Sequence, residues 1–185
     1  MTTLSNGATE TEHWPLTPDE RLEAAARDLD ATLVDELFEA VRKAGAAFLN
    51  RLVIDLFEAM GYDVAVSVEY PNPERTHGFD GVVRLDPLGI DKAFVRAKYQ
   101  STPVGTEDID SLEAALAKWN VRHGVLVTTA TYTPEAINAA ALASPELILI
   151  DGHRLARMML DFQVGVRVEK MIALARIDKS YFEEP

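Results

Sequence analysis

The 185-residue sequence contains no cysteine, and this absence excludes disulfides, thiolate metal ligands and thiol nucleophiles. No apolar run reaches the roughly 18 to 20 residues that a membrane-spanning helix requires. The N-terminus has neither the basic start nor the apolar stretch of a signal peptide. The four histidines show no metal-ligand spacing. We therefore expect a cytoplasmic protein with no membrane partner.

A surplus of basic residues is also missing, because the net charge is −12. Such acidity normally argues against a nucleic-acid partner. Its distribution weakens that argument. Residues 1–40 carry ten acids and two bases, a net of −8, whereas residues 41–185 carry twenty acids and sixteen bases, a net of −4. A local basic surface remains compatible with the larger part of the chain.

What the sequence does contain is enough apolar residues for a buried core, with 48% hydrophobic and 26% charged residues. Thr17-Pro18-Asp19-Glu20 is a capping box with proline at the first helical position. The helix that follows has one apolar stripe, made of Leu22, Leu29, Leu33, Leu37 and Val41. We expect a flexible tail over residues 1–16, an N-terminal helix over 17–45 and one domain over 46–185.

The remaining periodicity predicts a second helix over residues 46–60 and then three strands in succession. Further strands alternate with helices, and the pattern ends in a closing strand and a tail after residue 164. Successive strands followed by strands separated by helices indicate an α/β fold with a mixed β-sheet flanked by helices on both faces. The predicted strands are 62–69, 79–85, 92–99, 125–128 and 147–150.

Two neighbouring segments carry candidate chemistry. Asp80 lies between glycines at the start of one predicted strand, and Arg96 and Lys98 lie on one face of the next. A hairpin between these strands would bring Asp80 and Lys98 to one side of the sheet. Phosphodiester cleavage needs a cation to neutralise developing charge and an activated water to attack. By itself the pattern is weak, and a turn aspartate with an edge-strand lysine is the commoner explanation.

Beyond these two segments, further blocks of sequence matter by their order along the chain. The blocks, in order, are Phe48–Val53, Glu58–Tyr62, Gly78–Gly81, Asp86–Asp91, Val95–Lys98, Val104-Gly105, Gly124–Thr129, Ile150–Leu155, Arg176–Asp178 and Tyr181–Glu184. Through them the sequence resembles the Mrr family of type IV restriction endonucleases along nearly all of residues 17–185. This resemblance implies a restriction-endonuclease-like fold with a PD-(D/E)xK site and an N-terminal helical extension. It further implies Mg²⁺-dependent hydrolysis of DNA, with Asp80 as metal ligand and Lys98 as catalytic residue.

Two positions depart from the family pattern. Arg96 stands where the family has glutamine or, in related nucleases, an acid, and Asn50 stands where many members have glutamate. An arginine cannot accept a metal, and close to Asp80 it would compete with magnesium by forming an ion pair, which is what a degenerate nuclease predicts. Magnesium binding would then be weak or absent. Glu69 and Glu74 are substitute carboxylates, and His77 is an auxiliary residue that could touch a phosphate or a water.

The resemblance also implies double-stranded DNA as partner, with methylation of the target left open. Family members often carry a winged-helix domain ahead of this part, whereas here a 16-residue tail precedes the first helix. A homodimer would suit cutting of both DNA strands. Three hypotheses follow: an active endonuclease with an unusual ligand set, a degenerate nuclease domain that associates with DNA or protein, and a purely structural protein.

Overall fold

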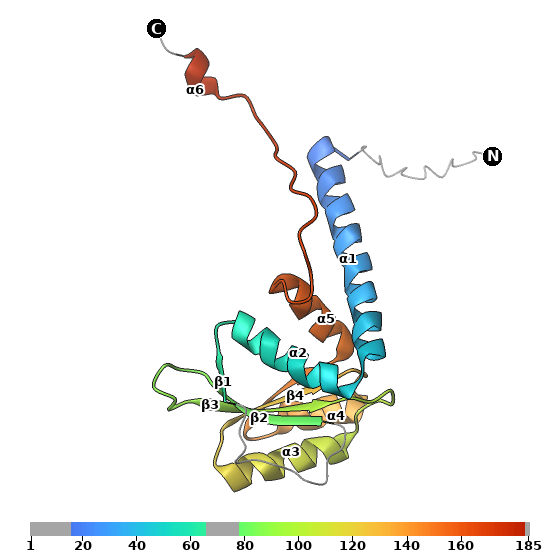
Figure 1. Cartoon of the computed structure of the whole chain (residues 1–185), viewed down its shortest axis with the longest axis vertical. Helices are drawn as coiled ribbons and strands as arrows, with labels where there is room; N and C mark the ends of the chain where they lie inside the picture. Colours follow the sequence, from blue (N-terminus) through green and yellow to red (C-terminus); the bar gives the residue numbers. More distant parts are fainter. Residues whose placement is uncertain (1–15, 66–77, 184–185) are drawn as a thin grey trace, which may run out of the picture.

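The computed structural model describes residues 16–65 and 78–183. Its centre is a mixed five-stranded sheet with the strand order β1-β2-β3-β4-β5 (Figure 1). The strands are β1 (Asp63–Ala65), β2 (Gly78–Arg84), β3 (Lys92–Lys98), β4 (His123–Thr128) and β5 (Glu146–Ile150). The first three strands pair antiparallel, and β3, β4 and β5 run parallel. The predicted mixed sheet and the β2–β3 hairpin are both confirmed.

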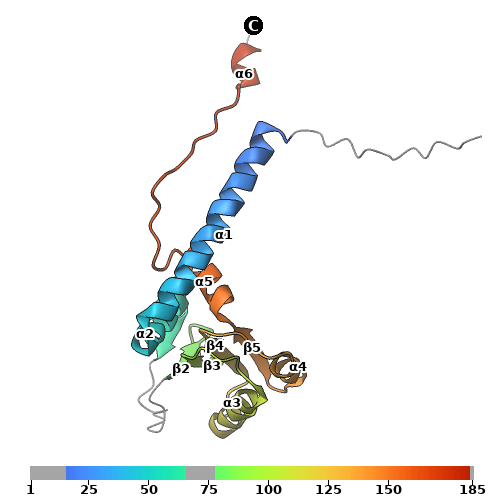
Figure 2. The same ribbon diagram turned by 90° about the vertical axis from the view of Figure 1, so that its right-hand side faces the viewer.

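Helices cover both faces of this sheet (Figure 2). One face is covered by α1 (Pro18–Ala44), α2 (Ala46–Ala59) and α5 (Gly152–Asp161), and the other by α3 (Thr106–Trp119) and α4 (Pro134–Leu142). A short helix, α6 (Lys179–Phe182), ends the chain. Both parallel connections pass through a helix, α3 between β3 and β4 and α4 between β4 and β5, as parallel strands require.

The strands divide their side chains between two cores, because successive residues of a strand point to opposite faces. On the α1–α2–α5 side, Val83, Val95 and Val127 are buried with leucines of α2. On the α3–α4 side, Phe94 and Leu126 pack against leucines of α3. Even-numbered residues of β3 therefore point toward α3. This parity determines where Arg96 and Lys98 lie.

The N-terminal helix begins as predicted. Thr17 Oγ1 accepts from the backbone N–H of Glu20, and the Glu20 carboxylate accepts from the backbone N–H of Thr17. The predicted stripe is buried only in its second half, at Leu37 and Val41, whereas Leu29 is 71% exposed. The reason is length: at 1.5 Å per residue α1 is about 40 Å long, and its first half extends past the body of the protein (Figure 1).

The closing strand predicted after residue 164 is wrong. The alternating Val164, Val166 and Val168 suggest a strand, but in the part of the chain that the structure describes these residues pair with none. Gly165 has a φ of 72°, which interrupts an extended conformation. The segment after α5 instead runs away from the sheet toward α6. No described helix combines the length and the apolar character needed to cross a membrane.

Candidate active site

Asp80 and Arg96 lie directly opposite each other in the β2–β3 ladder. Arg96 Nε donates to Asp80 Oδ1 at 2.8 Å, and Arg96 Nη2 donates to Asp80 Oδ2 at 3.1 Å. The remaining nitrogen, Nη1, donates to Ser111 Oγ on α3 at 3.2 Å. The side chains of Arg96 and Asp80 are only 5% and 11% exposed. The planar guanidinium thus binds both carboxylate oxygens in a fork, the strongest form of this interaction.

Burial explains why neither Arg96 nor Asp80 could be charged here without the other. A charge in the interior loses its hydration, and it is tolerated only when a partner and hydrogen bonds replace the water. Arg96 satisfies its nitrogens with Asp80 and Ser111, and its Cζ lies 5.5 Å from the centre of the Phe94 ring. The ion pair that the sequence suggests between Arg96 and Asp80 is therefore present. It lies buried on the face of the sheet that α3 covers.

Lys98 forms a second ion pair on the same face. Its Nζ lies 2.6 Å from Asp108 Oδ1, with side-chain exposures of 28% and 18%. Asp108 belongs to the first turn of α3, where the helix dipole favours a negative charge. Opposite Lys98 on β2 is Gly78, so no side chain of β2 covers the lysine directly. Lys98 is the more accessible of the two cations.

Sequence reasoning missed Asp108 and Ser111, although the helical period contains a signal for the first. The buried stripe of α3 includes Leu112 and Leu116, each with 0% exposure. Counting back four residues from Leu112 arrives at Asp108, so an acid continues an apolar stripe that faces the sheet. An acid in that position needs a cation on the sheet. Lys98 is that cation.

The other predicted site residues are not brought to this cluster by the described contacts. Asn50 lies on α2, which packs against the opposite face of the sheet. Its Oδ1 is buried and has no hydrogen-bond partner among the residues that the structure describes. Glu69, Glu74 and His77 fall outside the described residues. Their suggested roles stay predictions.

The described residues do not fit a divalent cation. Magnesium is held by free carboxylate oxygens together with phosphate and water. Here both oxygens of Asp80 accept from Arg96, and Asp108 accepts from Lys98. Within residues 16–65 and 78–183 there is also no group of three histidine or acidic residues that could hold a metal. A cation at Asp80 would have to displace the guanidinium first.

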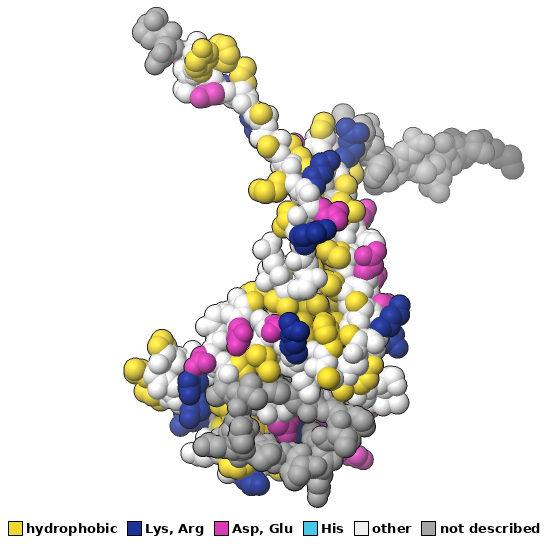
Figure 3. Space-filling model, in the orientation of Figure 1, with side chains coloured by type: hydrophobic (Ala, Val, Ile, Leu, Met, Phe, Trp, Pro, Cys, Tyr) yellow, Lys and Arg dark blue, Asp and Glu magenta, His cyan; other side chains and the backbone are white. Residues whose placement is uncertain are grey.

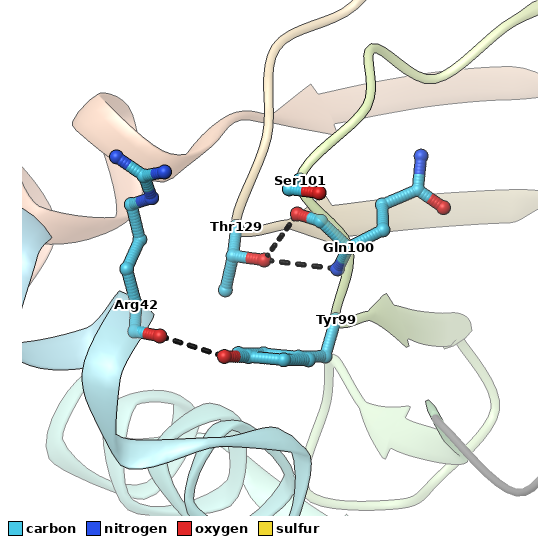
Figure 4. A pocket seen from close by; sticks show the side chains of 5 residues that line it. All are labelled: Arg42, Tyr99, Gln100, Ser101 and Thr129. Atoms are coloured by element: carbon cyan, nitrogen blue, oxygen red, sulfur yellow. Dashed lines mark hydrogen bonds between the residues drawn. The ribbon is translucent and has the colours of Figure 1, made fainter.

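A separate polar pocket of about 420 Å³ begins one residue beyond Lys98 (Figure 4). It is lined by Arg42, Tyr99, Gln100, Ser101 and Thr129, near the carboxyl ends of β3 and β4. Tyr99 Oη donates to the Arg42 carbonyl at 2.6 Å. Thr129 Oγ1 accepts from the Gln100 N–H at 3.1 Å and donates to its carbonyl at 2.9 Å. The first bond ties α1 to the end of β3, the other two join the segments that follow β3 and β4, and the pocket contains neither Asp80 nor Lys98.

Comparison with known proteins gives this geometry a family context. Residues 41–159 match the model of the catalytic region of Mrr, described as a restriction endonuclease. The type IV methyl-directed restriction enzyme EcoKMrr of Escherichia coli (strain K12) is 30% identical over 167 residues. The match covers 90% of this chain and 54% of the enzyme, so the chain spans about half the length of that relative.

Two solved structures were compared with the chain. The DNA modification-dependent restriction endonuclease AspBHI superposes with a TM-score of 0.51 at 18% identity, over 90% of this chain and 41% of that one. The MspJI restriction endonuclease, solved with a 27-mer oligonucleotide, has a TM-score of 0.44 at 17% identity, over 85% of this chain and 35% of that one. The AspBHI match supports the same arrangement of sheet and helices.

Proposed function

The chain belongs to the Mrr-type family of restriction endonucleases, and on this premise we propose that it acts on double-stranded DNA through a phosphodiester-hydrolysing centre at Asp80 and Lys98. The observation that supports the proposal most is the β2–β3 register. It sets Asp80 opposite Arg96, and it sets Lys98 two residues along β3 on the same face. An acid and a lysine of neighbouring strands therefore share one side of the sheet.

Hydrolysis requires that water attack phosphorus and lose a proton, that the P–O bond to the leaving oxygen break, and that this oxygen gain a proton. Lys98 is the group suited to hold the water or a phosphate oxygen, because its ammonium is partly exposed. Asp108 orients that ammonium at 2.6 Å. Asp80 takes part in the reaction only after its hydrogen bonds to Arg96 are broken. Magnesium is the cofactor that the resemblance implies, but the described residues do not fit it, and we derive no step through it.

The closed Arg96–Asp80 pair favours a second candidate function. In this alternative the domain binds DNA without cutting it, because the carboxylate needed for hydrolysis is permanently paired. Both partners are nearly buried, and Ser111 completes the donors of Arg96. Among the described residues, the Lys98 side chain remains 28% exposed beside this pair, so DNA could meet it there. The two candidates differ in whether Asp80 is ever released.

A nicking assay on supercoiled plasmid separates the candidates. Methylated and unmethylated plasmid would be incubated with wild type, Asp80→Asn, Lys98→Met and Arg96→Gln, with magnesium or manganese. Asp63→Asn is the matched control, because Asp63 pairs with Arg84 as a surface ion pair on the neighbouring strands. We expect nicking by wild type that both Asp80→Asn and Lys98→Met abolish, at least a hundredfold, and that Asp63→Asn preserves.

The other outcomes are equally informative. Nicking that appears only in Arg96→Gln supports the second candidate, a nuclease fold inactivated by its own arginine. Nicking that survives both Asp80→Asn and Lys98→Met contradicts the proposed centre. If no variant cuts, fluorescence anisotropy with a labelled duplex at low salt decides the rest. Absence of binding there overturns both candidates and leaves a structural role.

A further inference from the structure

The C-terminal residues 163–182, here called the arm, leave the body of the protein beyond α5. Figures 1 and 2 both show the arm and the first half of α1 extending from the same side of the body. Among the described residues, residues 165–178 make no backbone hydrogen bond. When unpaired backbone N–H and C=O groups of this kind become buried, they ordinarily form hydrogen bonds with a partner strand or helix.

The arm is also too apolar for a segment that remains in water. Val164 and Val166 pack against the core, but from Val168 onward the large apolar side chains of the arm are 60% to 89% exposed, and Figure 3 shows hydrophobic side chains at several places along its outer part. Exposed apolar residues gathered in this way mark a contact surface rather than scattered surface residues. The residues are Val168, Met171, Ile172, Leu174, Ile177, Tyr181 and Phe182.

The first half of α1, residues 18–32, is the complementary surface. It carries five acids and two bases, whereas the arm carries four bases and two acids. Within the single chain one contact joins the two kinds of surface, an ion pair between Arg176 Nη2 and Asp19 Oδ2 at 2.7 Å. The reach of the arm is sufficient, because residues 163–178 can extend to about 50 Å, whereas residues 18–32 of α1 span about 22 Å.

From these observations we propose that two copies of this chain associate by reciprocal exchange, the arm of each copy lying along the first half of α1 of the other. The second copy is the occupant that fits, because it offers an acidic, uncovered helix half within the reach of the arm and receives the same contact in return. Such an isologous arrangement closes on itself as a two-fold dimer. The arm and the helix half together comprise 35 residues, more than the roughly 20 to 30 residues a side that a stable interface requires.

Sedimentation equilibrium of the full chain tests the association. We expect a dimer at micromolar concentration, and we expect Leu174→Asp with Ile177→Asp to convert it to a monomer with an unchanged circular dichroism spectrum. The matched control is Leu88→Asp with Ile90→Asp, which places the same charges on equally exposed apolar residues of the β2–β3 turn. This control should remain dimeric. The proposal is overturned if the wild-type chain is still monomeric at 100 times this concentration. It is also overturned if the arm substitutions leave the dimer intact.

The absence of cysteine allows a direct test of which chains touch. One chain carries Asp19→Cys, and a second chain with a larger tag carries Arg176→Cys. After mixing, a short bismaleimide should join the two chains into a species of their combined mass. A chain that carries both cysteines distinguishes the two kinds of contact. If the arm touches only its own helix, dilution should not change the ratio of cross-linked monomer to cross-linked dimer. Cross-linking confined to one chain at every concentration would show that the arm folds back on its own helix, and the exchange would be wrong.

Discussion

At the scale of single residues, the candidate site of this domain consists of two carboxylates, each paired with its own cation. Asp80 is bound by Arg96 and Asp108 by Lys98, and all four lie between one face of the sheet and α3. The first pair is nearly buried and the second is partly open. Buried ion pairs contribute little when intact, but they leave a costly charge behind when one partner is removed. The two pairs should therefore respond differently to substitution.

We expect Asp80→Ala to lower the free energy of unfolding by about 3 to 5 kcal/mol, because it leaves the Arg96 charge buried and unpaired. Combining it with Arg96→Met should recover most of that loss, since both charges are then gone. Urea unfolding followed by circular dichroism measures both values. The comparison is Asp63→Ala, which breaks the surface pair with Arg84 and should cost about 0 to 1 kcal/mol. Equal losses for Asp80→Ala and Asp63→Ala would contradict the argument.

The same pair predicts a metal response that does not depend on cleavage. Wild type should show no change in melting temperature with 10 mM magnesium or manganese, because both oxygens of Asp80 already accept from the Arg96 guanidinium, whose positive charge opposes a cation there. Arg96→Gln frees that carboxylate, and we expect metal to raise its melting temperature by a few degrees. Asp80→Asn combined with Arg96→Gln is the control that should lose the effect. Stabilisation of wild type that Asp80→Asn removes would show that the carboxylate is already available.

At the scale of elements, α1 and α5 approach each other closely at one glycine. A Cβ built on Gly152, the first residue of α5, would lie 2.3 Å from Phe38 Cε2 and 2.9 Å from the Thr129 carbonyl oxygen. The stacked rings of Phe38 and His153, with centroids 4.1 Å apart, lie beside it. Glycine is thus required here by space, not by φ. The sequence block that contains Gly152 resembles the family, but the contact with α1 is visible only in three dimensions.

We expect Gly152→Ala to destabilise the protein by about 1 to 3 kcal/mol, or more, because the added methyl group meets backbone that cannot move aside. Thermal or urea unfolding measures the loss. Gly105→Ala is the matched control, since nothing lies within 4 Å of a Cβ there and the residue has an ordinary φ of −97°. A harmless Gly152→Ala would mean that α1 and α5 shift apart easily.

The start of α1 should be sensitive to pH. Hydrogen bonds from the backbone and hydroxyl of Thr17 lower the pKa of Glu20 below its ordinary value of 4.5. A lowered pKa in the folded helix means that the carboxylate stabilises the helix above pH 4.5, and that this effect is lost as the pH falls through the lowered pKa. Amide exchange in the first turn should therefore speed up in acid, beyond the intrinsic pH effect. Glu20→Gln should show no such transition.

At the scale of the whole molecule, a five-stranded sheet with helices on both faces carries an outlying helix half and an arm. The core residues on α1 begin at Leu33, so residues 18–32 contribute little to the body. These residues hold a concentration of acids on a chain whose net charge is already −12. Their negative field opposes the approach of DNA, whose binding is dominated by its phosphates.

We expect a chain that begins at residue 32 to keep the fold and to bind duplex DNA several-fold more tightly at low salt. Its loss of seven acids and two bases makes the net charge less negative by five. Anisotropy titrations at 50 mM and 500 mM salt measure the effect, which should vanish at the higher salt because charges beyond a Debye length of about 4 Å are then screened. Unchanged affinity at low salt would show that the acidic residues of α1 do not weaken DNA binding.

The sequence by itself determined the order of the elements, the mixed sheet, the capping box at Thr17 and the family, because these depend on local periodicity and on motifs read along the chain. It also suggested the Arg96–Asp80 pair, as the prediction of one of the three hypotheses, from strand alternation and a hairpin. Only the tertiary structure decided that Asp108 pairs with Lys98 and that Ser111 accepts from Arg96, because both come from a helix that crosses over the sheet. It also decided that the valines after Val164 form an arm and not a strand, and that half of the α1 stripe stays exposed. Both results depend on whether a partner surface lies within reach, and no local pattern contains that information.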